Sequence, residues 1–185
     1  MTIPVHRPKR AEVEKCVARF RDIRPISGGL PDMPLEDCQR NFYNVLGFAQ
    51  PDSDGEVFSP IGDEAKPKIS HLAAGFGMAY VEAEPGKGVL MHTHDTNETF
   101  VVVEGSWKFE WEGETGNEHV VCEEKDVVSF PVGIQRRFEC VSARPGKATG
   151  MIMAVVGGDK PGVEWSPEAV TRMKEAGTWP AEAAE

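Results

Sequence analysis

The feature that most constrains this chain is a series of short, strand-like runs between residues 69 and 156. Turn sequences separate the runs, as in Pro85-Gly86-Lys87-Gly88 and Arg144-Pro145-Gly146-Lys147. The expected strands cover residues 71–73, 78–83, 89–92, 99–103, 107–111, 120–123, 127–130 and 151–156. Strands that recur every 8–12 residues or so, with turns between them, are typical of an all-β sandwich or barrel.

One of these runs shows directly how its strand is oriented. Trp107, Phe109 and Trp111 alternate with the charged residues Lys108 and Glu110. Side chains alternate between the two faces of a strand, so this pattern indicates one buried and one more polar face. We therefore expect the three aromatic side chains to belong to the core of the barrel.

The segments on either side of the barrel differ from it in composition and in the secondary structure that they predict. Residues 1–65 mix proline- and glycine-rich stretches with a short helix near residues 10–20, which indicates an N-terminal arm that packs on the body or on a second subunit. Residues 66–158 form the expected barrel, and residues 159–185 form a tail with a helix. Ser166 can cap that helix, Pro167 suits its first position, and Gly177 can end it.

Charge and hydropathy argue against several classes of partner. The net charge of the 185-residue chain is -10, and its basic residues form no patch that would suit a nucleic acid. The first 15 residues place prolines and charges where a secretory signal needs an apolar core, and no run is long enough to span a membrane. We expect a soluble, cytoplasmic protein that binds neither nucleic acid nor membrane.

The four cysteines do not indicate a disulfide framework or a zinc knuckle. They are widely spaced and form no C-x-x-C pair. We expect Cys16, Cys38, Cys122 and Cys140 to be reduced thiols, most of them buried.

The residues with the clearest chemistry are His92, His94 and Glu98. His92 and His94 are two positions apart, so on a strand both imidazoles project from the same face. Asp95-Thr96-Asn97 can form a bend that brings Glu98 back beside them. Two histidines and one carboxylate are a known ligand set for transition metals, with coordination positions left open.

A less specific interpretation is that the two histidines are solvated loop residues. The flanking runs Val89-Leu90-Met91 and Phe100-Val101-Val102-Val103 are apolar, however, so part of the group is expected to be buried. Burial of two imidazoles and a carboxylate without partners costs several kcal/mol, whereas a metal ion satisfies all three. The flanking sequence therefore favours metal ligation.

The segment around these residues resembles the cupin family. Gly86, His92, His94, Glu98 and Gly105 match every fixed position of the first cupin motif, G-x5-H-x-H-x3-E-x6-G. The resemblance implies a small cupin-type β-barrel, a double-stranded β-helix or jelly roll, with a divalent transition metal on the two histidines and the glutamate. Iron(II) is the favoured ion, and manganese, nickel, cobalt or zinc are possible.

The second cupin motif, expected over residues 125–140, is degenerate. It survives as Pro131-Val132-Gly133, while Lys125 replaces the opening glycine and Cys140 replaces the final asparagine. Arg136 stands where the family usually has its last metal-binding histidine. Either three protein ligands hold the ion, or a residue from elsewhere completes the site, or weakened metal binding leaves a binding module.

Two residues are candidates for that additional ligand or for a place in the pocket. The first is His119, which precedes Val120 and Val121, and the second is Gln135. The alternative for His119 is a position in or beside the exposed turn that starts at Gly113.

The position of Arg136 raises two further alternatives. A permanent cation near a metal site weakens metal binding unless an anion lies between them, and arginine suits carboxylate and phosphate groups. This interpretation makes Arg136 a catalytic residue that orients a small anionic substrate. Alternatively, Arg136 forms a solvated pair with Arg137, or a salt bridge with Glu139 or Glu98.

These residues lead to three hypotheses about function. The first is a non-haem iron enzyme with dioxygenase-type chemistry that cleaves a ring or a C–C bond of an anionic compound. The second is a metal-dependent isomerase or lyase, in which the ion polarises a carbonyl. The third is a non-enzymatic barrel that binds or senses a small ligand. In each case we expect a homodimer, because pairing protects the edge strands of the barrel.

Overall fold

The structure is a computed structural model and describes residues 3–48, 59–61 and 66–180. Its two sheets hold the ten strands β1 (Asn41–Leu46), β2 (Phe76–Ala83), β3 (His92–His94), β4 (Glu98–Glu104), β5 (Ser106–Gly113), β6 (Gly116–Cys122), β7 (Val127–Phe130), β8 (Arg136–Ser142), β9 (Gly150–Gly157) and β10 (Val163–Trp165). The helices are α1 (Arg10–Glu14), α2 (Pro167–Glu175) and the single 3-10 turns η1 (Phe20–Asp22) and η2 (Glu36–Cys38).

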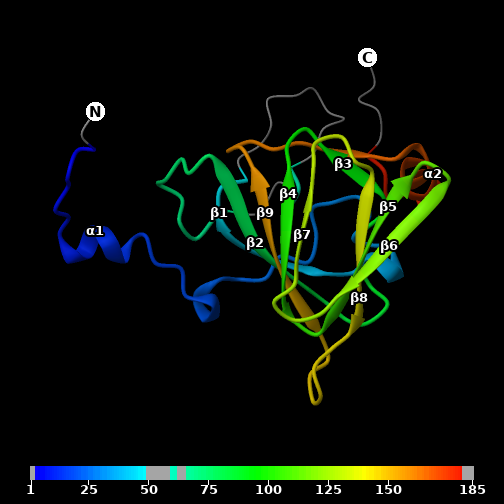
Figure 1. The fold of residues 1–185 in the computed structure, drawn as a ribbon, viewed down its shortest axis with the longest axis horizontal. Helices are drawn as coiled ribbons and strands as arrows, with labels where there is room; N and C mark the ends of the chain where they lie inside the picture. Colours follow the sequence, from blue (N-terminus) through cyan, green and yellow to red (C-terminus); the bar gives the residue numbers. More distant parts are fainter. Residues whose placement is uncertain (1–2, 49–58, 62–65, 181–185) are drawn as a thin grey trace.

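The two sheets are antiparallel and five-stranded, and they face each other across the core (Figure 1). One has the order β1-β2-β9-β4-β7 and the other β10-β3-β8-β5-β6. This arrangement confirms the predicted all-β barrel of jelly-roll type with a C-terminal helix.

Alternating burial along the strands builds the core as predicted. Phe100 and Val102 on β4 point inward, with 1% and 2% of their surface exposed. Trp107 and Phe109 on β5 are fully buried, and Trp111 is partly buried against the same core. The aromatic residues of β5 are therefore core residues.

The sheets extend into both flanking segments. β1, from the expected arm, pairs with β2, and β10, from the expected tail, pairs with β3. Phe42, Leu46 and Phe48 of the arm are buried on the body of the same chain. The arm therefore completes one sheet instead of merely covering it.

Some of the predicted strands were wrong. Residues 71–73 form no strand, and residues 89–91 lie outside the named strands, although the Val89 N–H donates to the Phe138 carbonyl and the neighbouring Gly88 forms a bridge with Glu139. β8 was not predicted, because its run of Arg136, Arg137 and Glu139 conceals the apolar alternation. In the structure Arg136 is an inward-facing residue with 1% exposure.

Of the two predicted helices, one is shorter than expected and the other forms as expected. The helix predicted near residues 10–20 is only α1, which has no buried residue and lies away from the sheets (Figure 1). α2 forms as predicted: the Ser166 side chain accepts a hydrogen bond from the Ala169 N–H at 3.1 Å, and Gly177 has a φ of +70°. None of the described helices is long and apolar enough to cross a membrane.

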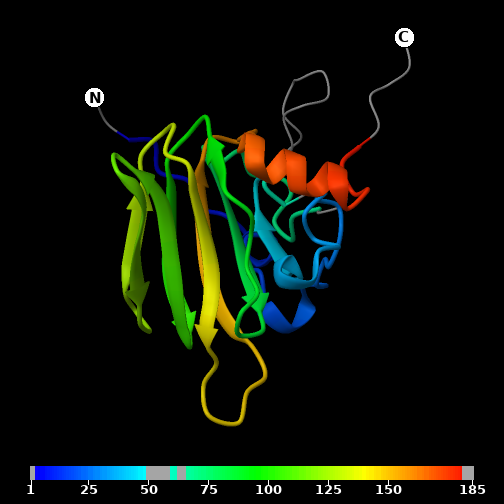
Figure 2. The same cartoon turned by 90° about the vertical axis from the view of Figure 1, so that its right-hand side faces the viewer.

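α2 lies across one end of the barrel, next to the N-terminal segment (Figure 2). Arg172 of α2 forms a bidentate ion pair with Asp37 of η2, with N–O distances of 2.6 and 2.9 Å. The ion pair thus joins α2 to the segment that precedes β1. All four cysteines are free, and Cys38, Cys122 and Cys140 are buried, as expected.

Candidate metal centre

The structure brings together the three residues that the sequence predicted as metal ligands. His92 and His94 occupy the inward face of β3, and Glu98 is the first residue of β4. Each is 3% to 4% exposed. One ligand atom from each residue lies within 4.8 Å of the others, which makes this the candidate metal group among the described residues.

Hydrogen bonds to the backbone fix the orientation of both imidazoles. His92 Nδ1 lies 2.8 Å from the Leu90 carbonyl oxygen, and His94 Nδ1 lies 2.5 Å from the Gly162 carbonyl oxygen. A carbonyl oxygen only accepts, so each Nδ1 carries a proton, and in the neutral imidazole each Nε2 then has a free lone pair. This is the tautomer in which a histidine binds a metal through Nε2. In the metal-free site His94 Nε2 lies 3.4 Å from Glu98 Oε2, an ion pair when His94 is protonated.

The charge states of the site also suit a metal ion. Burial, helped by the charges of Arg136 and His94, holds the pKa of His92 well below its usual 6.5. Burial alone would raise the pKa of Glu98, but the charges of His94 and Arg136 outweigh it and lower that pKa to about 2. At neutral pH the site therefore offers a neutral His92 and an ionised Glu98.

Arg136 forms an ion pair with Glu98. It lies opposite His92 on the neighbouring strand β8, and its Nη2 and Nε lie 2.8 and 3.2 Å from Glu98 Oε2. A third N–H donates to the Ile134 carbonyl at 3.1 Å. Of the alternatives considered for Arg136, the structure shows the salt bridge with Glu98.

Neither candidate for an additional ligand lies at the site. His119 is an exposed residue of β6 and pairs with Glu110 of β5. Gln135 is half-buried and lines a surface groove together with Glu110 and Arg137. Strand alternation explains this position, because Gln135 adjoins the inward-facing Arg136.

A cavity of about 30 Å³ adjoins the three ligand residues. Apart from the ligands, Arg40 and Trp165, its lining is apolar and includes Leu30, Phe42, Phe48, Pro60, Ile61, Ala79, Val81, Val89, Phe100, Phe138, Ala154, Val156 and Val163. Sequence reasoning missed Arg40 and Trp165, because no local motif marks either of them. Trp165 reaches the site through the pairing of β10 with β3, where it lies opposite His92.

The donor set fits a divalent transition metal. It combines two Nε2 atoms with free lone pairs and one carboxylate, which are the donors that such ions prefer. The Arg136 guanidinium is the feature that opposes metal binding, but it bonds a single carboxylate oxygen, Oε2. His92, His94 and Glu98 would hold the ion.

Two facing sheets with a His-His-Glu group on the consecutive strands β3 and β4, one from each sheet, define a β-barrel with a candidate metal centre. Residues 79–155 match the model of the cupin domain family, and the two-sheet fold agrees with that match. The comparison with curated protein sequences finds no match.

Solved structures share the fold at low sequence identity. The oxalate decarboxylase of Lactobacillus farciminis has a TM-score of 0.56 and 12% identity, over 88% of this chain and 43% of its own. The vicilin of Solanum melongena has a TM-score of 0.54 and 13% identity, over 89% of this chain and 39% of its own. Peruvianin-I, a cysteine peptidase from Thevetia peruviana latex, has a TM-score of 0.54 and 13% identity, over 88% and 84%. At these identities the likeness concerns the fold alone.

Proposed function

We propose that this chain is a metal-dependent cupin enzyme that acts on a small organic anion in a non-haem iron, dioxygenase-type reaction. His92, His94 and Glu98 hold the ion, with iron(II) favoured. When bound, the ion supplies redox chemistry and open coordination positions for the substrate and oxygen. The protein supplies a water-excluding pocket and fixed positions for the reacting groups.

The observation that carries this proposal is that the described residues around the cavity offer no acid or base besides the three proposed ligands. Among the described residues that line it, the titratable ones are the three ligand residues and Arg40. Arg40 is held in a bidentate pair with Asp32, with both N–O distances at 2.9 Å. An isomerase or lyase needs a side chain that moves a proton, so this cavity favours oxygen chemistry instead.

The count of ligands supports the same choice. The position that holds a fourth metal ligand in the family pattern is here Arg136, which cannot bind a cation because it has no acceptor atom. Three protein ligands on an octahedral ion leave three positions, enough for a bidentate substrate and one oxygen molecule.

The charge of the site explains why the substrate should be an anion. Arg136 already offsets the charge of Glu98 through their ion pair, at 2.8 Å. The charge of a divalent ion would therefore remain largely uncompensated inside a buried site, where an unpaired charge is costly. An anionic ligand would compensate it.

Two buried donors next to the cavity also favour a ligand with acceptor atoms. The Nε1 of Trp165 and the Nε of Arg40 have no hydrogen-bond partner among the described residues. The Trp165 ring lies 5.6 Å from the His92 ring, centroid to centroid. We expect a substrate oxygen to accept a hydrogen bond from the Trp165 indole.

The size of the cavity sets the size of the substrate. A cavity of roughly 150 Å³ is needed to hold a benzene molecule, whereas this one encloses about 30 Å³. We therefore expect a compact anionic ligand, smaller than an aromatic ring, such as a short 2-oxo acid or a short dicarboxylate. The oxalate decarboxylase relative was solved as a formate complex, and the vicilin is described with anionic ligands.

Oxygen uptake by metal-loaded protein tests the proposal. Protein reconstituted anaerobically with iron(II) should consume oxygen with at least one of these compact anions, whereas zinc-loaded protein should not, because zinc has no redox chemistry. Catechols, whose aromatic ring is larger than the cavity, serve as a size control and should not be consumed. Turnover under nitrogen, or equal turnover with zinc, would move the assignment to the isomerase or lyase alternative. Anion binding without turnover on any of these compounds would favour the binding module.

Metal content gives a separate test of the site. His92→Ala and His94→Ala should lose tight metal binding while the barrel stays folded, since each removes a ligand and leaves the apolar core intact. His119→Ala is the matched control, because His119 is an exposed histidine of β6 and should keep full metal content. Wild-type metal content in the His92→Ala/His94→Ala double variant would contradict the assignment.

A further inference from the structure

Both candidate metal histidines are held by the same kind of three-part connection. Each imidazole donates from Nδ1 to a backbone carbonyl, and the amide N–H of that same backbone residue donates to an aspartate. The residue between is Leu90 for His92 and Gly162 for His94. The aspartates are Asp32 and Asp95, at 3.4 and 3.0 Å from the respective amide nitrogens.

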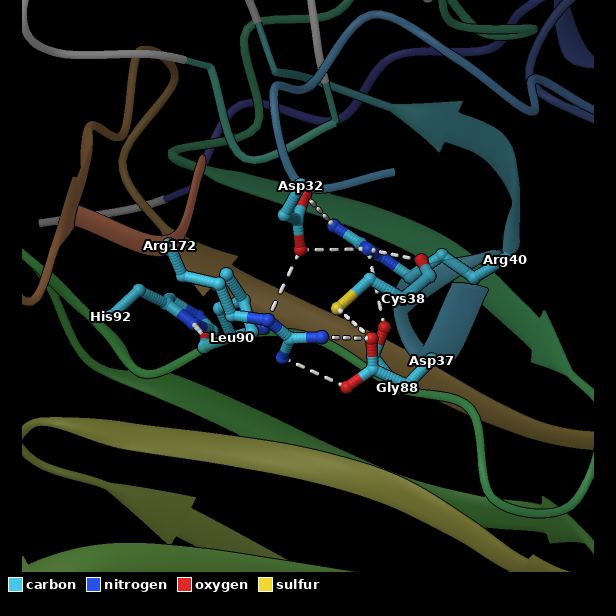
Figure 3. A network of polar contacts seen from close by, with 8 residues as sticks. All are labelled: Asp32, Asp37, Cys38, Arg40, Gly88, Leu90, His92 and Arg172. Carbon is cyan, nitrogen blue, oxygen red and sulfur yellow. Dashed lines mark hydrogen bonds and ion pairs between the residues drawn. The ribbon is translucent and has the colours of Figure 1, made fainter. Parts of the chain in front are cut away.

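The first connection runs from the N-terminal arm to His92 (Figure 3). Asp32 is fully buried and receives both terminal nitrogens of Arg40. Arg40 also donates to the carbonyls of Cys38 and Gly88, which fixes the ion pair on the chain that leads into β3. The remaining contact of Asp32, the long one at 3.4 Å, is to the Leu90 N–H.

The second connection runs through the loop that follows β9. Gly162 lies just before β10, and its carbonyl accepts the His94 Nδ1 proton at 2.5 Å. Asp95, directly after His94, accepts the Gly162 N–H through Oδ1. Unlike Asp32, Asp95 is exposed, so it can be replaced without disturbing the core.

Neither intermediate residue is fixed by a regular strand. Leu90 precedes β3 in an extended segment, and Gly162 belongs to the turn between β9 and β10. If the carbonyl turned away, the imidazole would lose its partner and its defined orientation. Hydrogen-bond partners of ligand histidines set the tautomer and the ring orientation, and their loss typically weakens metal binding about 10- to 100-fold.

We propose that Asp32 and Asp95 are positioning residues for the metal centre, each acting on one histidine through a backbone residue. The inference rests on the proposed metal site, and it makes the N-terminal arm a part of that site. Asp32 orients His92 from the arm, and Asp95 orients His94 from the end of β3.

Cobalt(II) binding by the whole chain tests this proposal, since its visible absorption reports the ligand geometry. Asp95→Ala should weaken cobalt(II) binding about tenfold, measured by competition with a chelator, and should change the absorption spectrum. Asp95→Asn keeps an oxygen that can accept the Gly162 N–H, and should restore most of both. If Asp95 contributed only to the stability of the fold, the absorption spectrum of cobalt(II) bound to Asp95→Ala would equal that of wild type.

The arm is tested with Asp32→Leu/Arg40→Met, which removes both charges of the buried pair together and also removes the oxygen that accepts the Leu90 N–H. The control is Asp37→Asn, which breaks the neighbouring exposed pair with Arg172 and touches neither histidine connection. The double variant should bind cobalt(II) more weakly with an altered spectrum, and Asp37→Asn should match wild type.

The outcomes separate this inference from the metal site itself. Wild-type protein that fails to bind cobalt(II) would overturn the metal site and the inference together. Wild-type protein that binds, beside Asp95→Ala protein with equal affinity and an equal spectrum, would overturn the positioning role of Asp95 alone. If the double variant fails to fold, the exposed Asp95 still tests the connection to His94, and Arg40→Lys, which keeps a charge beside Asp32, tests the connection to His92.

Discussion

Arg136 is the residue that most clearly ties stability to metal binding. It is 1% exposed and pairs with Glu98, which is also buried. Breaking a buried pair from one side typically costs about 3–5 kcal/mol, because a charge is left without a partner. A divalent ion on Glu98 would provide a replacement partner.

We therefore predict that Arg136→Met lowers the Tm of the metal-free protein and enlarges the rise in Tm on addition of manganese(II) or zinc(II). Thermal unfolding with and without metal measures both effects. Arg137→Met is the control, since Arg137 is the next residue of β8 and pairs with Glu139. An unchanged metal-induced rise in Tm in Arg136→Met would show that the ion pair and the metal do not share Glu98.

The shifted pKa values of His92 and Glu98 predict how the metal-free protein responds to acid. The pKa of His92 is lower in the fold than its usual 6.5, so the unfolded chain binds more protons as pH falls below 6.5. The pKa of Glu98 falls from 4.5 to about 2 on folding. Between these two pH values the unfolded chain again binds more protons than the folded one. Both groups make stability fall with falling pH.

The expected slope below pH 6.5 is at most about 1.4 kcal/mol per pH unit from His92. Urea unfolding of metal-free protein at a series of pH values measures it. His92→Gln should flatten the dependence between about pH 5 and 6.5. A free energy of unfolding that stays level across that interval in wild type would contradict the burial of a neutral His92.

The ligand group could be predicted from sequence because its members are close together along the chain. It was enough to know the spacing of His92, His94 and Glu98 and the apolar residues beside them to predict that these three side chains come together. The partner of Arg136 stayed open, since several acidic residues lie within its reach. Trp165 was missed because only the pairing of β10 with β3 brings it to the site.

At the level of elements, the strands that were predicted are those with a clear apolar alternation. β4 and β5 carry that alternation in the sequence and form as expected. β8 was hidden because a buried arginine looks like a surface residue until its partner is known. β1 and β10 lie in segments rich in turn residues, and only their long-range pairing makes them strands.

The Ser166 cap supports α2 and the strand beside the site. Its side chain accepts the Ala169 N–H, and its own N–H donates to the Met91 carbonyl just before β3. Ser166→Ala should lower the free energy of unfolding by about 1 kcal/mol through loss of the cap. Urea unfolding measures the change, and Ser166→Asp should restore most of it. Equal stability of Ser166→Ala and wild type would show that the cap contributes nothing.

At the scale of the whole molecule, the outer strand β6 is the candidate for contact with a second copy. It is paired on one side only, and Val120 and Val121 are 40% and 46% exposed. An exposed apolar edge strand tends to pair with another chain, and a two-fold dimer would cover it.

We predict a homodimer whose contact includes β6. Val121→Lys should shift the protein toward monomer in sedimentation equilibrium, because a charged side chain on an edge opposes pairing. Val132→Lys, an exposed valine of the turn after β7, is the control. A monomeric wild type, or a dimer insensitive to Val121→Lys, would place the contact elsewhere or exclude it.

The pairing of β10 with β3 has a consequence for the order of events during synthesis. The His94 imidazole donates to the Gly162 carbonyl, and His92 lies opposite Trp165, so both histidines depend on residues that are synthesised after strands β1 to β9. A ribosome-bound chain that stops before residue 160 holds the metal-binding motif but not its supports. We therefore expect tight metal binding only after β10 has been synthesised and has paired with β3.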